Sequence, residues 1–182
     1  SVVDKEGDVT SCTAIVTIED NLPPEVICTP ITVELDATGM AIVTGEMIAG
    51  ESTDNCAIAS IEVSTTMFDC TMVGEHDVTI TVTDVNGNSN SCDSTVTVVD
   101  ATLPTAICNN LTLELDADGL ASIEVADIDN GSFDNCGNVT VQIDTTTFTC
   151  DNLGVNNVVL TVTDDNGNVS ECNAMVTIAT LP

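Results

Sequence analysis

Apolar and polar residues alternate in short runs along the chain, which is the periodicity of strands with one buried face. Val, Ile and Thr dominate these runs, and such residues favour pleated, half-buried strands over helices. Gly, Asn, Asp and Pro separate the runs. The pattern therefore predicts an all-β protein of short strands and tight turns. In the first half of the chain the expected strands are Ile31–Leu35, Met40–Val43, Ile58–Val63, Val78–Thr83 and Ser94–Val99.

The whole pattern returns with a period of about 80 residues, and such self-similarity is the signature of tandem structural repeats. Each period carries a set of four cysteines with the same spacing. Three segments around the cysteines match their counterparts without a gap: 32–39, 52–56 and 81–88 match 112–119, 132–136 and 161–168. The cysteines are Cys28, Cys56, Cys70 and Cys92, followed by Cys108, Cys136, Cys150 and Cys172.

The period divides the chain into two complete units, 21–100 and 101–182, each expected to form an immunoglobulin-like β-sandwich. Residues 1–20 are expected to be the C-terminal hairpin of a preceding repeat, because Cys12 has the place in the period that Cys92 has in the first unit. The linkers contain Leu-Pro sequences and are only a few residues long. Short linkers stiffened by proline favour a rod over a loose string of modules.

Composition narrows the range of partners. The chain has one Lys, no Arg and 30 acidic residues, which gives a formal net charge of −29. Nucleic acids and anionic membrane surfaces require cationic side chains, so neither is an expected partner. No apolar run is long enough to insert directly into a membrane. The remaining candidates are divalent cations, basic surfaces and neutral glycans, although strong net charge also serves solubility alone.

Nine cysteines with only one His and no C-x-x-C pair favour disulfides over a metal framework. Disulfides in turn predict an extracellular location. One pairing scheme would join the fourth cysteine of each unit to the first cysteine of the next, as in Cys12 with Cys28. The segment 13–18 between them is expected to be extended, and about ten extended residues span roughly 30 Å. A disulfide requires Cα atoms within about 7 Å, so this scheme fails if the segment is a strand.

Pairing within each unit fits better. In an immunoglobulin-like sandwich the first and last strands can run side by side in parallel, so that the cysteines opening them meet. This predicts Cys28–Cys92 and Cys108–Cys172. The remaining cysteines of each unit then form the pairs Cys56–Cys70 and Cys136–Cys150.

These features resemble the hyalin repeat family of extracellular modules. The matching residues are Ile27-Cys28, the 53–56 loop, the segments 82–84 and 86–88, and Cys92. The resemblance implies an immunoglobulin-like fold. Phe-x-Cys at 68–70 and again at 148–150 is most similar to the repeats of giant gliding-motility adhesins of Bacteroidetes, of the SprB type. Such proteins are exported to the cell surface by the type IX secretion system, so the resemblance implies an adhesive or filamentous surface protein.

Closely spaced Asp and Asn residues suggest calcium, because carboxylate and amide oxygens are the hard ligands it prefers. The alternative is a hairpin turn, since Asn-Gly supplies the positive φ angles that tight turns require. In this fold two loops and the chain entry lie at one end of each module, so acids should gather at each junction, with Ca²⁺ between them. The candidate ligands are Asp20, Asp54, Asp84, Asn86 and Asn88, followed by Asp100, Asp134, Asp164, Asn166 and Asn168.

Catalysis needs a positioned acid, base or nucleophile, and the chain offers one His, one Lys and no Tyr or Arg. The sequence therefore predicts no enzyme. We expect a structural repeat region of a secreted cell-surface adhesin or filament, which acts as a stiff stalk in surface adhesion or gliding motility. Its expected partners are neighbouring repeats, other copies in a filament, and an extracellular substratum. The alternative is that the repeats themselves bind a glycan or surface ligand multivalently.

Overall fold

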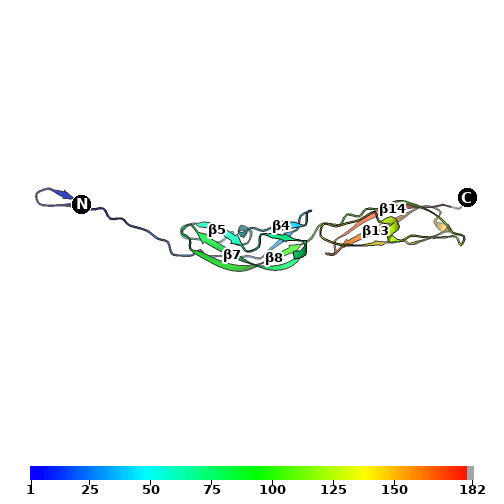
Figure 1. Ribbon diagram of the computed structural model, residues 1–182, viewed down its shortest axis with the longest axis horizontal. Helices are drawn as coiled ribbons and strands as arrows, with labels where there is room; N and C mark the ends of the chain where they lie inside the picture. The colour runs from blue at the N-terminus through cyan, green and yellow to red at the C-terminus, as the bar shows by residue number, and fades with distance from the viewer. Residues whose placement is uncertain (180–182) are drawn as a thin grey trace.

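Two β-sandwich modules lie end to end along the long axis of the molecule, preceded by a thin N-terminal segment (Figure 1). The structure, a computed structural model, describes residues 1–179. Residues 180–182, the end of the expected unit 101–182, lie outside the described part. None of the helices in residues 1–179 has the length and apolar character needed to cross a membrane.

Module 1 contains six strands, and the structure adds elements that the sequence pattern did not predict. The strand β6 and the short helix α1 were missed, and β7 and β8 are longer than expected. The helix α1 buries Ile48 and Ala49 against the sandwich. The elements are β3 (Ile31–Glu34), β4 (Met40–Ile42), α1 (Gly45–Ala49), β5 (Ile58–Val63), β6 (Met67–Asp69), the 3₁₀ turn η1 (Cys70–Met72), β7 (Gly74–Asp84) and β8 (Ser89–Val99).

Module 2 repeats this order, as the sequence period predicts. Its elements are β9 (Leu111–Glu114), β10 (Leu120–Ser122), α2 (Val125–Ile128), β11 (Val139–Ile143), β12 (Thr147–Thr149), the 3₁₀ turn η2 (Cys150–Asn152), β13 (Gly154–Asp164) and β14 (Val169–Ala179). The all-β fold class with two tandem sandwiches is confirmed.

Each module packs a four-stranded sheet against a two-stranded one. The order is β3-β8-β7-β5 with β4-β6 in module 1, and β9-β14-β13-β11 with β10-β12 in module 2. The first and last strands of each module pair in parallel, with Ile31 opposite Val96 and Leu111 opposite Val176. This parallel pairing is the arrangement on which the expected first-to-fourth cysteine bond depends.

Alternating apolar residues of the long strands fill each core. Val78, Ile80 and Val82 of β7 are at most 2% exposed, and the equivalent residues of β13 are completely buried. Phe68 and Phe148 supply the largest buried side chains. These residues lie at matching positions of the period, so both modules are built around the same packing plan.

The N-terminal segment contains a small hairpin of β1 (Val2–Val3) and β2 (Val9–Thr10). Its turn has the same construction as the β7–β8 turn. The Asp4 carboxylate accepts hydrogen bonds from the backbone N–H groups of Glu6 and Asp8 at 3.0 and 2.9 Å, and Gly7 has a φ of 93°. The described structure therefore contains turns of one kind at the same place in each successive period.

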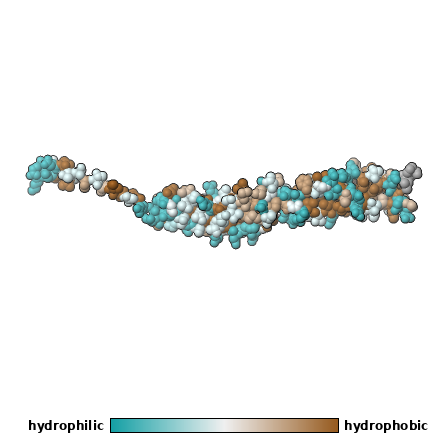
Figure 2. Space-filling view, viewed as in Figure 1, coloured by the Kyte–Doolittle hydropathy of each residue, from teal (hydrophilic) through white to brown (hydrophobic). Residues whose placement is uncertain are grey.

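Residues 13–18, expected to be extended, form no strand in the structure. Val16 and Ile18 are 82% and 92% exposed, whereas Val96 and Val98 at the equivalent positions of module 1 are at most 1% exposed. Figure 2 shows this apolar stretch as brown atoms in the thin part of the molecule. The segment thus carries the apolar pattern of a last strand without the sandwich on which such a strand packs.

Candidate metal centre at the module junction

Three carboxylates converge at the end of module 2 that faces module 1. Asp100 comes from the linker, Asp134 from the loop before β11, and Asp164 from the end of β13. Each offers an oxygen that lies within 4.8 Å of the oxygens of the other two. Asp20, Asp54 and Asp84 meet in the same way at the matching end of module 1. The expected convergence of linker and loop acids is therefore present in both modules.

The turn after β13 positions the Asp164 carboxylate. Its Oδ1 accepts the backbone N–H groups of Asn166 and Asn168 at 2.9 and 2.8 Å. Gly167 has a φ of 90°, a conformation in which a Cβ would be strained. The segment is thus a tight turn, as the alternative interpretation held, and the same turn aims an acid at the junction.

The linker is held against this turn by asparagine side chains. Asn168 Nδ2 donates to the Asp100 carbonyl at 3.1 Å and to Asp164 Oδ2 at 2.8 Å. Asn166 Nδ2 donates to Asp100 Oδ2 at 2.9 Å. In module 1 Asn88 Nδ2 makes the equivalent bonds to the Asp20 carbonyl and to Asp84 Oδ2. Asn88 and Asn168 therefore tie linker to turn, and cation ligation by the four asparagines stays a prediction.

Some carboxylate oxygens at these sites are buried without a hydrogen-bond partner among the described residues. They are Asp20 Oδ2, Asp54 Oδ1 and Asp134 Oδ1. The second oxygen of Asp134 accepts the Cys136 backbone N–H at 2.7 Å, so the side chain is fixed while the first oxygen lacks a donor. A buried acceptor without a partner is costly, and a bound cation would satisfy it.

Two aspartates of the module 1 cluster, Asp20 and Asp84, have a pKa below the ordinary value. A hydrogen bond from the Cys56 thiol, aided by the Leu22 backbone N–H, lowers the pKa of Asp20 below its ordinary value. Burial acts to raise the pKa of Asp84, but hydrogen bonds from Asn88, Asn86 and Gly87 outweigh it and the net pKa is lowered. The same contact with Asp20 raises the pKa of the Cys56 thiol. Negative charge is therefore concentrated where no positive side chain is available.

The chain's one Lys is Lys5, in the N-terminal hairpin and outside both clusters. Like charges held this close repel each other unless a cation lies among them. A donor set made of oxygens fits a hard cation such as Ca²⁺ better than a transition metal. The residues that would hold it are Asp100, Asp134 and Asp164 in the second cluster, with the matching three aspartates in the first.

The structure confirms two of the four expected disulfides and corrects the others. Cys28–Cys92 and Cys108–Cys172 are present, each with a sequence separation of 64. The pairs Cys56–Cys70 and Cys136–Cys150 are wrong, because Cys70 bonds to Cys136 across the junction, with Cα atoms 5.1 Å apart. Among residues 1–179, Cys12, Cys56 and Cys150 retain exposed thiols.

Strand geometry explains the correction. Cys56 precedes β5 at the end of module 1 where the linker enters, whereas Cys70 follows β6 near the other end. The six residues of β5 span about 20 Å, which is far beyond the reach of a disulfide. The cysteine nearest to Cys70 therefore belongs to the next module.

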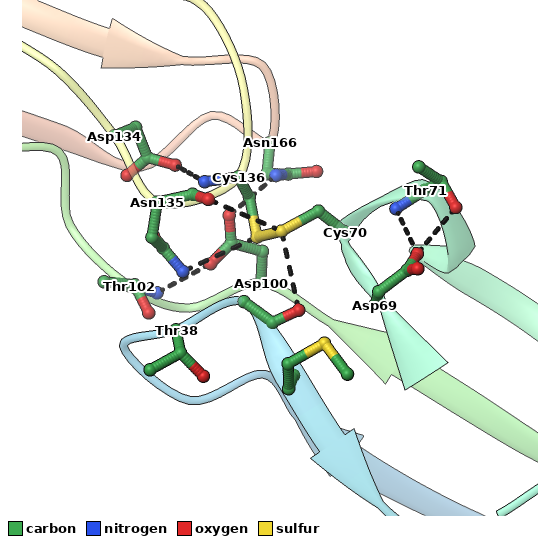
Figure 3. Close-up of a disulfide and its surroundings, with 12 residues drawn as sticks. Thr38, Asp69, Cys70, Thr71, Asp100, Thr102, Asp134, Asn135, Cys136 and Asn166 are labelled. Atoms are coloured by element: carbon green, nitrogen blue, oxygen red, sulfur yellow. Dashed lines mark hydrogen bonds between the residues drawn. A yellow bond between two sulfur atoms is a disulfide. The ribbon is translucent and has the colours of Figure 1, made fainter. Parts of the chain in front are cut away.

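Further contacts close the junction around this bond (Figure 3). Asn135 Nδ2 donates to the Asp36 carbonyl of module 1 at 3.2 Å. Gly39, with a φ of 75°, lies against the bond, since a Cβ there would come within 2.5 Å of Cys70 Sγ. The loop that carries Asp134 is thus bonded to module 1, and the metal candidate and the disulfide share one loop.

A family model described as the HYR domain matches residues 19–98, which span the linker and nearly all of module 1. This match supports an HYR/Ig-like repeat in that part of the chain. Comparison with curated proteins gave no match.

Several solved structures are similar to the chain. For human protocadherin-24 EC1-2 the TM-score is 0.45 at 10% identity, covering 88% of this chain and 100% of that one. Drosophila N-cadherin EC1-4 gives 0.41 at 11% identity, covering 87% of this chain and 50% of that one. Human mucin-like protocadherin EC1-2 gives 0.35 at 10% identity, covering 87% and 98% respectively.

Disulfides persist in oxidising compartments. Together with the HYR match, the three disulfides among residues 1–179 support an extracellular repeat module.

Proposed function

We propose that the chain is part of a stiff stalk in a secreted surface adhesin, in which each joint between modules is locked by a disulfide and a bound calcium ion. The observation that carries the proposal is the joint itself. The bond between Cys70 and Cys136, the amide contact of Asn135 and the acid cluster of Asp134 all act on one loop. A module held by three kinds of contact at its linker end has little freedom to swing.

The charge of the chain and its lack of repeated exposed aromatic residues also support a spacer role. The formal charge of −29 makes neighbouring copies repel one another and keeps long arrays dispersed. Two of the three Phe side chains are buried in the cores, and only Phe133 is exposed, at 56%. Its counterpart in module 1 is Thr53, so no aromatic platform for a sugar ring is repeated along the rod. A role in gliding motility rests on the resemblance of the repeats and belongs to the same proposal.

Calcium contributes charge neutralisation at the junction when it is bound. The carboxylate of Asp100 belongs to the linker, while Asp134 and Asp164 belong to the body of module 2. An ion held by all three would fix the linker to the module and relieve the repulsion among them. The disulfide then constrains the same loop from the side of module 1.

The calcium part is tested by thermal unfolding of the oxidised chain in EGTA, in calcium and in magnesium. At a hundredfold excess over Kd, calcium should raise the Tm by roughly 10 °C. Magnesium should do much less, because it demands a near-ideal octahedral shell and dehydrates reluctantly. Asp134→Asn should weaken the calcium response, whereas Asp118→Asn in an exposed turn is the matched control. Equal melting curves in EGTA and calcium would refute the metal centre.

The stalk part is tested with beads coated with the chain and passed under flow over glass and polysaccharide surfaces. A spacer predicts retention no greater than that of albumin-coated beads. Retention that grows steeply with coating density would instead favour the alternative, in which the repeats bind a surface ligand multivalently.

A further inference from the structure

The disulfide between Cys70 and Cys136 joins two different kinds of cysteine position. Cys70 opens the 3₁₀ turn η1 at the exit end of module 1. Cys136 lies in the loop before β11 at the entry end of module 2. The bond therefore joins an exit cysteine of one module to an entry cysteine of the next, with a sequence separation of 66.

The same two positions occur once more in the described structure, each with an exposed thiol. Cys150 opens η2 and is the exit cysteine of module 2, the counterpart of Cys70 in the sequence period. Cys56 is the entry cysteine of module 1 and the counterpart of Cys136. Cys150 and Cys56 thus have the positions of the two cysteines that are joined in the Cys70–Cys136 bond at the junction.

The exit side keeps its bonded geometry even where the bond is absent. Cys70 Sγ lies 3.6 Å from the Gly39 carbonyl oxygen, and Cys150 Sγ lies 3.9 Å from that of Gly119. Gly39 and Gly119 have φ angles of 75° and 76°. The residue before each cysteine accepts a backbone N–H with its side chain and so caps the turn. The exposed Cys150 thiol therefore has the same local surroundings as the bonded Cys70.

The entry side is equally well ordered. The backbone N–H of Cys56 donates to Asp54 Oδ2 at 2.7 Å, as that of Cys136 does to Asp134 Oδ2. The neighbouring amide of Asn55 lies 3.7 Å from the Cys56 sulfur, and the corresponding distance for Asn135 is 3.5 Å. One difference is informative. Asn135 Nδ2 donates to the Asp36 carbonyl of module 1, whereas Asn55 Nδ2 lies 3.4 Å from Asp20 Oδ1.

We propose that Cys150 and Cys56 are complementary halves of one inter-module disulfide, so that modules of this type join exit to entry in a covalent series. The partner of Cys150 is the Cys56 position of a following module, and Asn55 of that module then donates to the Asp116 carbonyl. The inference extends the proposed rod and requires no bound cation.

The chemistry is an oxidation with a small-molecule disulfide such as oxidised glutathione as the acceptor. One cysteine thiolate attacks the acceptor and releases one thiol, and the second cysteine displaces the remaining half as another thiol. The two protein thiols lose two electrons and two protons, and the acceptor becomes two thiol molecules. One S–S bond is broken in the acceptor and one is formed between the modules.

The test is a tandem chain in which residues 1–179 are followed by residues 20–182. This fusion keeps the register of the period, because Asp20 takes the place that Asp100 has after Val99. It also gives Cys150 of the first copy and Cys56 of the appended copy the same sequence separation as the observed bond, 66. Cys12→Ser removes the thiol of the N-terminal segment, and Cys56→Ser in the first copy with Cys150→Ser in the appended copy leaves Cys150 and Cys56 at one position each. The protein is refolded in a glutathione buffer, alkylated and mapped by mass spectrometry without reduction.

The expected result is a linked pair of peptides that contain Cys150 and the appended Cys56, in about the same yield as the Cys70–Cys136 pair. Replacing Cys150 by Ser in the first copy should leave the appended Cys56 alkylated. Replacing Asn55 by Ala in the appended copy should lower the equilibrium constant for forming the bond against glutathione by roughly fivefold, through one lost hydrogen bond. Asn157→Ala, on β13 away from both ends, is the matched control.

The inference is overturned if Cys150 and the appended Cys56 are both alkylated while Cys70–Cys136 is intact in the same molecules. It is also overturned if Cys150 pairs indiscriminately with other cysteines of the chain. Neither result would bear on calcium or on the spacer role, because those depend on the melting and flow measurements.

Discussion

The entry ends of the two modules have the same residues in different surroundings. In module 2, Asp100, Asp134 and Asp164 lie beside a disulfide to the preceding module, and Asp100 is 5% exposed. In module 1 the equivalent cluster lies beside Cys56, which carries an exposed thiol in place of the bond. The carboxylate cluster is nevertheless assembled in both places. The acid cluster therefore forms without a disulfide to a preceding module, and the preceding module contributes one cysteine of that disulfide.

The largest effect should come from removing the junction bond with Cys70→Ser and Cys136→Ser. In the chain-entropy model a cross-link over this separation contributes about 4 kcal/mol, and here the contribution is shared by the two modules. The two modules should then unfold in separate calorimetric transitions at lower temperature. The matched control, Cys56→Ser with Cys150→Ser, should leave the curve unchanged. If both double substitutions lowered the unfolding temperatures equally, the Cys70–Cys136 bond would contribute no stability of its own.

A smaller effect is expected from the asparagines that tie linker to turn. Asn168→Ala removes bonds to the Asp100 carbonyl and to a carboxylate oxygen of Asp164. Losing these two hydrogen bonds should cost about 2 kcal/mol of unfolding free energy in module 2. Asn88→Ala should cost module 1 a similar amount, because Asn88 makes the same contacts there. Urea titration measures both. A loss confined to Asn168→Ala would mean that the entry end of module 1 is not built in the way described.

The glycines beside the exit cysteines offer a finer comparison. Both Gly39 and Gly119 have a positive φ. A Cβ in that conformation is strained, so Gly39→Ala and Gly119→Ala should each cost roughly 1 kcal/mol or more. Gly39→Ala should cost more, since its Cβ would come within 2.5 Å of the bonded Cys70 Sγ, whereas the contact at Gly119 is 3.1 Å and involves a thiol that can rotate away. Urea titration should rank them in this order, and the reverse order would contradict the packing of the bond against Gly39.

The smallest expected effect is on the pH dependence of stability, through the Asp36 carboxylate in the turn before β4. The Thr38 hydroxyl donates to the Asp36 carboxylate at 2.6 Å and lowers its pKa below the ordinary 3.8. A lowered folded pKa gives stability that is present above the ordinary value and is lost as the pH falls through the folded value. Thr38→Val should therefore raise the pKa of Asp36 towards its ordinary value and move the start of acid destabilisation to slightly higher pH. Carboxyl NMR titration of Asp36 measures this, and an unchanged pKa would contradict the assignment.

The sequence was sufficient for the features that each module contains within itself. The period predicted both sandwiches, the parallel first and last strands, and the Cys28–Cys92 and Cys108–Cys172 bonds. The convergence of Asp54 and Asp84 on the linker also followed from which loops share one end of the fold. The helix α1 was missed because so short a helix gives too little periodicity to read.

The sequence interpretation failed where two modules meet. It weighed only one pairing between units, that of a fourth cysteine with the next first one, and then joined Cys56 to Cys70, although the strand after Cys56 carries the chain away from it. A count of residues cannot distinguish pairs within a unit from pairs between units, since both leave the period intact. Asking at which end each cysteine lies would have excluded Cys56–Cys70, because β5 separates the two positions by about 20 Å.

The most direct test of a locked joint is to measure residual dipolar couplings of backbone amides in both modules, in calcium and in EGTA. The account predicts that one alignment tensor fits modules 1 and 2 together in calcium. In EGTA the fit should worsen, because the acid cluster then repels the linker while the Cys70–Cys136 bond still limits the motion. Two tensors of different magnitude in calcium would mean that the modules move independently, and the stiff stalk would be refuted.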